Sequence, residues 1–308
     1  MRMELLQLRY FCVVAQYENM TRAAEELYVA QSSLSKTIKK LETELGVPLF
    51  NRVGKRLCLN KFGENFYQNV SISLQKLDNA VKELRDSSKD VTGVVTIMVK
   101  AAINTIPQLL KEFKKKCPLV TVRVLTPFYD IECKERQDFD IVIFGTPDEY
   151  DSPYKIPLMK NEEIVLMVPK GHPLAGRGAI NLAEAASYPF IAYSKSSSID
   201  RLFASMCENA GFTPAILFES DNDMIHAELA SAGLGVSLVP LKTMSFVFLD
   251  GVEIVKLNSI YNKRDIWLAW NSARYMSKAV KALIDHYVDF FAILEHVGLE
   301  RYCRKNIL

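Results

Sequence analysis

Three short helical patterns, separated by very short turns, fill the N-terminal part of the chain and limit its fold more than any other feature. Residues 4–17 place apolar side chains at helical spacing, and Asn19 or Thr21 can cap a second helix. A third pattern follows at 29–45, and Gly46 provides the glycine that commonly ends a helix. Helices this short, joined this tightly, predict a helix-turn-helix.

The third helix has two chemically different sides. Its aliphatic side chains fall within an arc of about 60° at 3.6 residues per turn, and they are Leu34, Ile38, Leu41 and Leu45. Its opposite side carries short polar groups near the N-terminal end and cations further along, namely Ser32, Ser35, Lys36, Lys39 and Lys40. Short polar side chains can approach base edges in the major groove, and lysines beyond them can reach phosphates. The pattern therefore predicts a DNA-reading helix, with an ordinary solvated face as the alternative.

The next segment, FNRVGKRLCLNKFG, is typical of a basic β-wing. Gly54 permits a tight turn between two short apolar pieces, and the cations around it are Arg52, Lys55, Arg56 and Lys61. From residue 28 to residue 61 the chain has seven Lys or Arg against two acids, a local charge of +5 compared with +2 for the whole chain. Because positive charge is concentrated where the helix-turn-helix is predicted, local electrostatics favour nucleic acid as a partner.

A long, unbroken helical pattern runs from Asn60 to Ser87. A helix of this length extends about 40 Å, and it carries an apolar stripe of Phe66, Val70, Leu74, Leu77, Val81 and Leu84. Such a stripe needs a partner helix, most simply from a second copy of the chain. The alternative is that the helix lies on its own domain.

After a hinge-like segment, SSKDVTG, strand and helix patterns alternate, which is typical of an α/β domain. Chain crossings near 155–165 and 258–266 divide this domain into two lobes. We therefore predict an α+α/β chain with a winged helix-turn-helix at 1–60, a linker and dimerisation helix at 61–90, and a two-lobed α/β domain at 91–308. Lobe I would comprise about 91–160 and 266–308, and lobe II about 161–265.

Composition and termini argue against several classes of protein. An apolar content of 49% and a charged content of 24% are ordinary for a soluble globular chain. The first residues are interrupted by Glu4 and Arg9 and do not resemble a signal peptide, and no uncharged run approaches the roughly 18 residues of a membrane span. Six scattered cysteines and four isolated histidines indicate neither a disulfide framework nor a zinc site. We expect a cytoplasmic protein with no membrane contact, metal or cofactor.

Motifs for catalysis are missing from the sequence, so we do not expect an enzyme. There is no G-x-S-x-G, paired Cys/His site or phosphate-binding glycine loop, and the acids Glu162, Glu163, Asp221 and Asp223 fit a solvated surface. Cys207 lies on a predicted helix without a neighbouring cysteine, which argues against peroxide sensing. A solute-binding protein would share a two-lobed fold, but the basic N-terminal region and the lack of a signal peptide argue against that class.

The N-terminal region resembles the winged helix-turn-helix of LysR-type transcriptional regulators. The similarity covers an Ala-Ala helix, a Gln-initiated helix, Glu-Leu-Gly-x-x-Leu-Phe, an arginine in the wing and a glycine at the linker start, all within LLQLRYFCVVAQYENMTRAAEELYVAQSSLSKTIKKLETELGVPLFNRVGKRLCLNKFGENF. LVPKGHPLA and AGLGVSLVP resemble the family's effector domain. The resemblance implies a bacterial DNA-binding regulator whose two-lobed domain is like periplasmic solute-binding proteins. It also implies a homodimer or homotetramer joined through linker helices, and contact with RNA polymerase.

The same resemblance implies roles for individual residues. Gln31, Ser32, Ser35 and Lys36 would face bases, while Thr21, Lys39, Arg52, Lys55 and Arg56 would hold phosphates or enter the minor groove; Arg22, Ser33 and Lys40 complete the predicted DNA-binding set. Two positions depart from the family, since Ser32 stands where proline is usual and Lys36 where arginine is common. Lysine cannot make the planar bidentate contact of arginine, which changes base readout at that point.

The resemblance implies that residues 91–308 form an effector-binding domain with a small molecule between the two lobes. The walls of this cleft should come from strand ends, where ligands of α/β folds bind. The predicted wall from lobe I is Ala101, Ala102, Ile103, Asn104, Thr126, Pro127, Phe128, Phe144, Gly145 and Thr146, and lobe II adds Ser196, Ser197 and Ser198 at a helix start. Hydroxyl and backbone N–H groups there suit a carboxylate or phosphate, which favours a small organic anion; alternatively, these serines only cap the helix. The apolar stretch AAIN favours a ligand with a hydrophobic portion.

Overall fold

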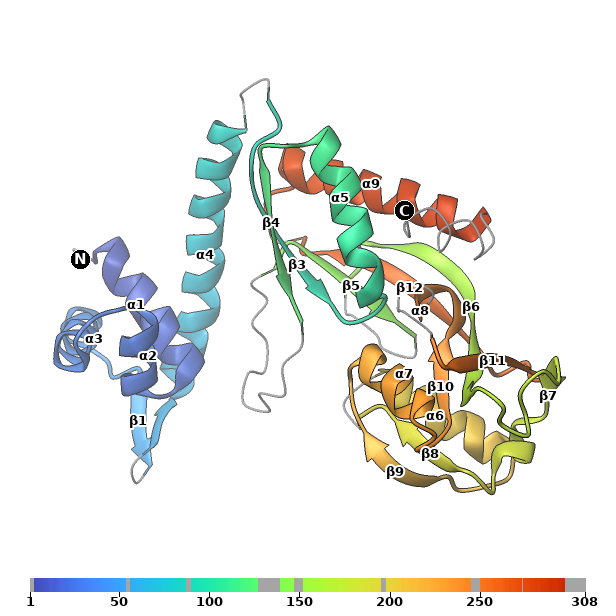
Figure 1. Cartoon of the computed structure of the whole chain (residues 1–308). Helices are drawn as coiled ribbons and strands as arrows, with labels where there is room; N and C mark the ends of the chain where they lie inside the picture. The colour runs from blue at the N-terminus through green and yellow to red at the C-terminus, as the bar shows by residue number, and fades with distance from the viewer. Residues whose placement is uncertain are drawn as a thin grey trace. The chain divides into compact units, whose positions relative to one another are not determined.

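A computed structural model describes most of the chain, which divides into two compact units (Figure 1). The first comprises Met1–Ser87 with Ala273–Tyr275, and the second comprises Ser88–Ser272 with Met276–Leu308. The described residues are 3–53, 56–86, 90–126, 139–146, 152–194, 198–244, 250–272 and 274–296.

The first unit contains the predicted helix-turn-helix and wing. Its elements are α1 (Leu5–Tyr17), α2 (Met20–Glu26), α3 (Gln31–Leu45), β1 (Phe50–Val53), β2 (Arg56–Leu59) and α4 (Lys61–Arg85). The three short helices enclose a core in which Phe11, Leu34 and Leu41 are fully buried. Strands β1 and β2 pair antiparallel, with Phe50 opposite Leu59 and Val53 opposite Arg56. The predicted winged helix-turn-helix is therefore confirmed.

Local sequence explains where these helices begin and end. Asn19 caps α2, since its side-chain oxygen accepts hydrogen bonds from the backbone N–H groups of Thr21 and Arg22. Gly46 ends α3 with a φ of +73°, in the left-handed region that favours glycine. At the start of α4, a Cβ on Gly63 would lie 2.1 Å from the carbonyl oxygen of Leu49, so the close approach of wing and linker helix requires glycine there.

The apolar stripe of α4 has two different environments. Near its N-terminal end, Phe66 packs on Phe11 of α1, with ring centroids 5.2 Å apart, and Val70 and Leu74 are each only 7% exposed. An ion pair between Arg9 Nη2 and Asp78 Oδ1, at 2.6 Å, also holds α1 along α4. The rest of the stripe is exposed, namely Leu77, Val81 and Leu84. The first half of the helix therefore lies on its own domain, as the alternative interpretation expected.

The second unit is α/β, as predicted. Its strands are β3 (Gly93–Val99), β4 (Val120–Leu125), β5 (Ile141–Gly145), β6 (Lys155–Pro169), β7 (Ala179–Ile180), β8 (Pro189–Ala192), β9 (Ala215–Glu219), β10 (Ser237–Pro240), β11 (Val252–Leu257) and β12 (Lys263–Trp270). Its helices are α5 (Ile106–Lys116), α6 (Ser198–Asn209), α7 (Asp223–Ser231), α8 (Leu241–Met244) and α9 (Lys278–His296), with 3₁₀ turns η1 (Ile103–Thr105) and η2 (Leu182–Ala185).

The long strand β6 connects two regions of one sheet. The strand order is β4-β3-β5-β12-β6-β11-β7, and β10 also pairs with β6. The first part of β6 pairs with β12, whereas its last residues pair with β10 and β11. On either side of this crossing lie separate hydrophobic cores, one around Leu109, Leu283 and Tyr287 and the other around Phe190 and Leu166. Figure 1 shows α5 and α9 together over the sheet that carries the first core. Two cores joined by β6 and β12 are what a two-lobed domain requires.

Candidate functional site

Helix α3 presents its predicted polar side to solvent. Leu34, Ile38 and Leu41 are buried in the core of the first unit. The polar side chains turn away from that core: Gln31, Ser32, Ser33, Lys36, Lys39 and Lys40 are exposed, and Ser35 is half-buried. Thr21 and Arg22 on α2 are exposed as well. The hydrophobic pattern alone therefore orients this face correctly.

The N-terminus of α3 has no side-chain cap. Its N-cap is Ala30, which has no side chain to accept hydrogen bonds from the first N–H groups of the helix. Those groups and the helix dipole favour a negatively charged partner such as a DNA phosphate. Helix α2 differs, because Asn19 satisfies the corresponding donors there.

The three lysines of α3 are not equivalent. Lys40 Nζ lies 3.4 Å from Glu4 Oε1 and 4.0 Å from Glu44 Oε1, so acids of its own domain compete for it. Within the described part of the chain, Lys36 and Lys39 form no ion pair. Lys36 and Lys39 are thus the better candidates for phosphate or base contacts.

The predicted contacts of the wing fall largely outside the described residues. The backbones of Arg52 and Arg56 belong to β1 and β2, but their side chains are outside the described set, as is the whole of Lys55. One exposed residue near α3 was not predicted. Tyr28, in the turn between α2 and α3, is 95% exposed and has a φ of +53°. A non-glycine residue in that conformation is uncommon, and its position beside the reading helix makes it a further candidate for DNA contact.

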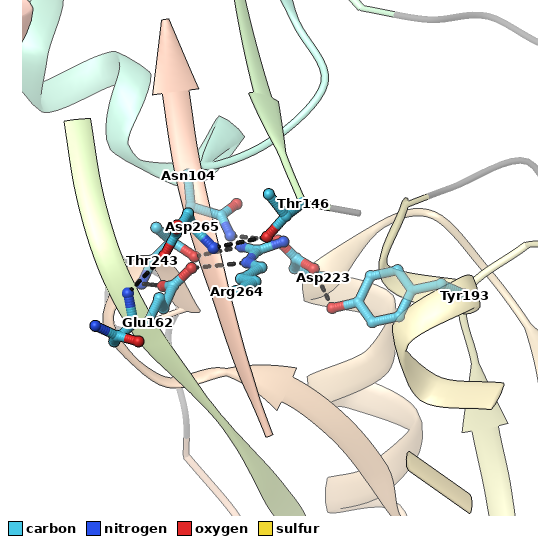
Figure 2. Close-up of polar contacts among 9 residues, drawn as sticks. Asn104, Thr146, Glu162, Tyr193, Asp223, Thr243, Arg264 and Asp265 are labelled. Carbon is cyan, nitrogen blue, oxygen red and sulfur yellow. Dashed lines mark hydrogen bonds and ion pairs between the residues drawn. The ribbon is translucent and has the colours of Figure 1, made fainter. Parts of the chain in front are cut away.

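The second candidate site is a polar network where the two lobes meet (Figure 2). Asn104 lies in the 3₁₀ turn η1 of lobe I, and Asp223 lies at the start of α7 in lobe II. The Nδ2 atom of Asn104 donates a hydrogen bond to Oδ2 of Asp223, 2.5 Å away. The hydroxyl of Tyr193, just after β8, donates to the other oxygen of Asp223. One carboxylate therefore accepts hydrogen bonds from side chains that are far apart in the sequence.

A buried histidine holds the ring of Tyr193 in place. Its ring stacks on His226, with centroids 4.2 Å apart. His226 Nε2 lies 2.8 Å from the carbonyl oxygen of Ser220, and Nδ1 lies 2.7 Å from the hydroxyl oxygen of Ser237. Burial lowers the pKa of His226, so its neutral form is favoured. Burial, together with the nearby charge of Asp223, raises the pKa of Tyr193 well above its usual value, and the phenol keeps the proton that it donates.

A buried ion pair lies in the same network. Arg264 Nε is 2.8 Å from Glu162 Oε2, and these side chains are 4% and 0% exposed. Thr243 completes the arrangement, since its N–H donates to Glu162 Oε1 and its hydroxyl accepts from Arg264 Nη2. Glu162 and Asp223 are therefore not the surface acids that we expected. Their partners come from other elements of the fold, which explains why the local sequence gave no sign of burial.

Three further residues hold the two crossing strands together. Asp265 donates its N–H to Thr146 Oγ1 at 2.8 Å and accepts a hydrogen bond from the Thr146 N–H at 2.9 Å. Its carboxylate also accepts from the N–H of Asn161, at 2.8 Å. Asn161 has a φ of +54°, and the pairing of β6 with β12 shifts register at Arg264 and Ile266. This irregular backbone lies where the chain passes between the lobes.

The predicted effector residues are distributed unevenly. Asn104 and Thr146 belong to the network, Gly145 lies beside Arg264, and Ile103 is exposed. Ala101 and Ala102 are each 6% exposed and pack in the core of lobe I, and Phe144 packs with Val142 and Ala269 in another cluster, so these side chains offer little surface to a ligand. Thr126 is half-buried at the end of β4. Pro127, Phe128, Ser196 and Ser197 lie outside the described residues, as does the side chain of Ser198, which begins α6.

Two further features concern the reactivity of Cys207 and the presence of membrane-spanning helices or metal sites. Cys207 is buried, and burial raises the pKa of its thiol to about 12, which disfavours the reactive thiolate. No helix among the described residues is long and apolar enough to cross a membrane, and the same residues contain no cluster of metal-binding side chains.

These observations define a class of protein, in which a winged helix-turn-helix precedes an α/β ligand-binding domain. Residues 5–64 match the bacterial regulatory helix-turn-helix family of LysR type, and residues 88–292 match the LysR substrate binding domain. The chain therefore belongs to the LysR-type transcriptional regulators. It is a DNA-binding regulator with an effector-binding domain and not an enzyme, as the sequence predicted.

Known proteins are similar to this chain over nearly its whole length. The uncharacterized regulator YybE of Bacillus subtilis is 28% identical over 296 residues, which cover 94% of this chain and 100% of YybE. The transcriptional dual regulator GltC of the same organism is 28% identical over 297 residues, covering 95% and 99%. A full-length OxyR variant from Pseudomonas aeruginosa has the same fold, with a TM-score of 0.70 at 20% identity, over 98% of this chain and 97% of that one.

Proposed function

We propose that α3 enters the major groove of an operator, where Gln31, Ser32, Ser35 and Lys36 face bases and Lys39 holds a phosphate. The observation that carries this proposal is the exposed polar side of α3, with an N-terminus that has no side-chain cap. Thr21, Arg22 and the wing residues Arg52, Lys55 and Arg56 would contact the backbone or the minor groove. We include Ser33 and Lys40 in the interface, with Lys40 the weaker contributor because of its acidic neighbours.

Replacing Gln31 tests the reading role directly. Gln31→Ala should reduce discrimination between operator and random DNA by about 1–3 kcal/mol, because a direct base contact is lost. Fluorescence anisotropy with both DNAs at one salt concentration measures this difference. Thr43→Ala, an exposed change on the far end of α3, is the matched control. Equal weakening of both DNAs by Gln31→Ala would assign it to the backbone instead.

We further propose that the regulator acts as a homodimer or homotetramer in the cytoplasm, joined through the exposed half of α4. Leu77 and Val81 are 52% and 46% exposed and continue a stripe that α1 covers only at its beginning. A second copy would bury them. Val81→Glu should therefore lower the sedimentation coefficient at micromolar concentration, and Lys82→Glu, on the same turn, should not. Equal sedimentation of both variants and the parent would place the interface elsewhere.

The effector, in this proposal, binds at the lobe junction near Asn104, Gly145 and Thr146. This position is supported by a polar network built from both lobes around the crossing strands. A ligand there would favour one arrangement of the lobes over another, and so change operator binding and contact with RNA polymerase. The organic-anion hypothesis depends on Ser196, Ser197 and Ser198, whose side chains are outside the described residues, and it stays a prediction.

A further inference from the structure

The carboxylate of Asp223 is the group at the lobe junction that most constrains a ligand. It accepts hydrogen bonds from Asn104 of lobe I and Tyr193 of lobe II, and both of these donors are uncharged. Among the described residues, no lysine, arginine or histidine forms an ion pair with it. An ionised carboxylate that is half-buried and paired only with neutral donors would be stabilised further by a cation.

The cation of the same network forms its ion pair with Glu162 and donates to Thr243, and it forms no ion pair with Asp223. The residues labelled in Figure 2 include the carboxylates Glu162, Asp223 and Asp265 but only one guanidinium, that of Arg264. Among these labelled residues, carboxylates therefore outnumber cations. A second carboxylate brought close to Asp223 would be repelled, whereas an ammonium or guanidinium group would be attracted.

The two hydrogen bonds of Asp223 differ in how easily they can be exchanged. Tyr193 belongs to the same lobe, is 6% exposed and stacks on His226, so its hydroxyl is fixed. Asn104 belongs to the other lobe and is only half-buried. Separation of the lobes would remove the Asn104 amide from Oδ2 of Asp223 and leave that oxygen without its donor. A ligand that excludes water from the junction would have to supply a donor of its own, because an unsatisfied buried carboxylate oxygen is costly.

We propose that the effector carries a protonated amine or a guanidinium group that binds Asp223 in place of Asn104 Nδ2. This inference rests on the proposed effector site at the lobe junction and names the chemical class of its ligand. Asp223 selects the positive group, and Tyr193 positions Asp223 for it. Asn104 is the competing internal donor, so its removal favours the ligand-bound arrangement.

Titration calorimetry on the full-length protein tests this with three probes that share one ring: benzylamine, benzyl alcohol and benzoate. We expect benzylamine to bind more tightly than the other two. Asp223→Asn, which keeps an acceptor for Tyr193, should weaken benzylamine at least tenfold, as the loss of a hydrogen bond to a charged group predicts. Asp223→Glu should retain the preference for the amine. Glu228→Gln, an exposed acid on the same helix, is the matched control and should change binding less than twofold.

A fourth variant gives a readout that a purely structural role of Asp223 would not produce. Asn104→Ala should tighten benzylamine binding severalfold, because it removes the competing donor. Tighter binding of benzoate than benzylamine, weakened by Thr146→Ala, would overturn the ligand class while leaving the site in place. Benzylamine binding that neither Asp223→Asn nor Asn104→Ala changes would overturn the site itself. If no probe binds, the inference is overturned, and operator binding by the same protein decides the DNA-binding proposal separately.

Discussion

The two polar regions of this regulator, the exposed side of α3 and the lobe junction, differ in whether their charged groups already have partners. On α3, Lys36 and Lys39 are exposed and have no ion-pair partner among the described residues. At the lobe junction, Arg264 and Glu162 are buried and satisfy each other. The first region has charges available for a large polyanion, and adding DNA costs it no internal contact. The second is already satisfied, so a ligand must replace an internal hydrogen bond in order to bind.

This contrast predicts that removing a charge lowers the free energy of unfolding much more at the junction than on α3. Glu162→Ala leaves Arg264 buried without its partner and should destabilise the second unit by about 3–5 kcal/mol. Both tryptophans, Trp267 and Trp270, lie in β12 of that unit, so tryptophan fluorescence during urea unfolding reports on it alone. Lys36→Ala should stay within about 0.5 kcal/mol of the parent protein. A similar small effect of Glu162→Ala would remove the distinction between the two regions.

A substitution in the first unit tests the stability of that unit without changing any charge. The Cβ of Gly63→Ala would lie 2.1 Å from the Leu49 carbonyl oxygen and 2.7 Å from Leu59 Cδ2, so wing and linker helix must move apart. We expect a loss of about 1–3 kcal/mol, typical of overpacking. Far-UV circular dichroism should show an earlier transition while tryptophan fluorescence is unchanged. Glu64→Ala, the exposed neighbour, is the control, and identical unfolding of both variants would show that Gly63 is not required for packing.

The two regions also differ in how far the sequence predicts them. The face of α3 follows from the positions of Leu34, Ile38 and Leu41 along one helix, because helical periodicity alone separates its buried and exposed sides. Glycine at position 46 and the Asn19 cap follow from local chemistry in the same way. The two-lobed α/β arrangement was predicted by the alternation of strand and helix patterns.

The junction could not be predicted by such rules. Glu162 and Arg264 are 102 residues apart, and Asn104 and Asp223 are 119 apart, so only the folded sheet brings them together. Each acid, taken with its neighbours in sequence, has the polarity of a surface residue. Similarly, the stripe on α4 showed that a partner was needed, but not that Phe66 at its start packs on Phe11 of α1.

The most direct test of the account is the salt dependence of operator binding for Lys39→Ala and Lys40→Ala. Both lysines are exposed on α3 and adjacent in sequence, but only Lys40 lies beside acids of its own domain. If α3 contributes its free cations to DNA, Lys39→Ala should lower the slope of log affinity against log salt by about one ion, and Lys40→Ala should change it much less. Unchanged slopes in both variants, with operator binding intact, would contradict the placement of this face against DNA.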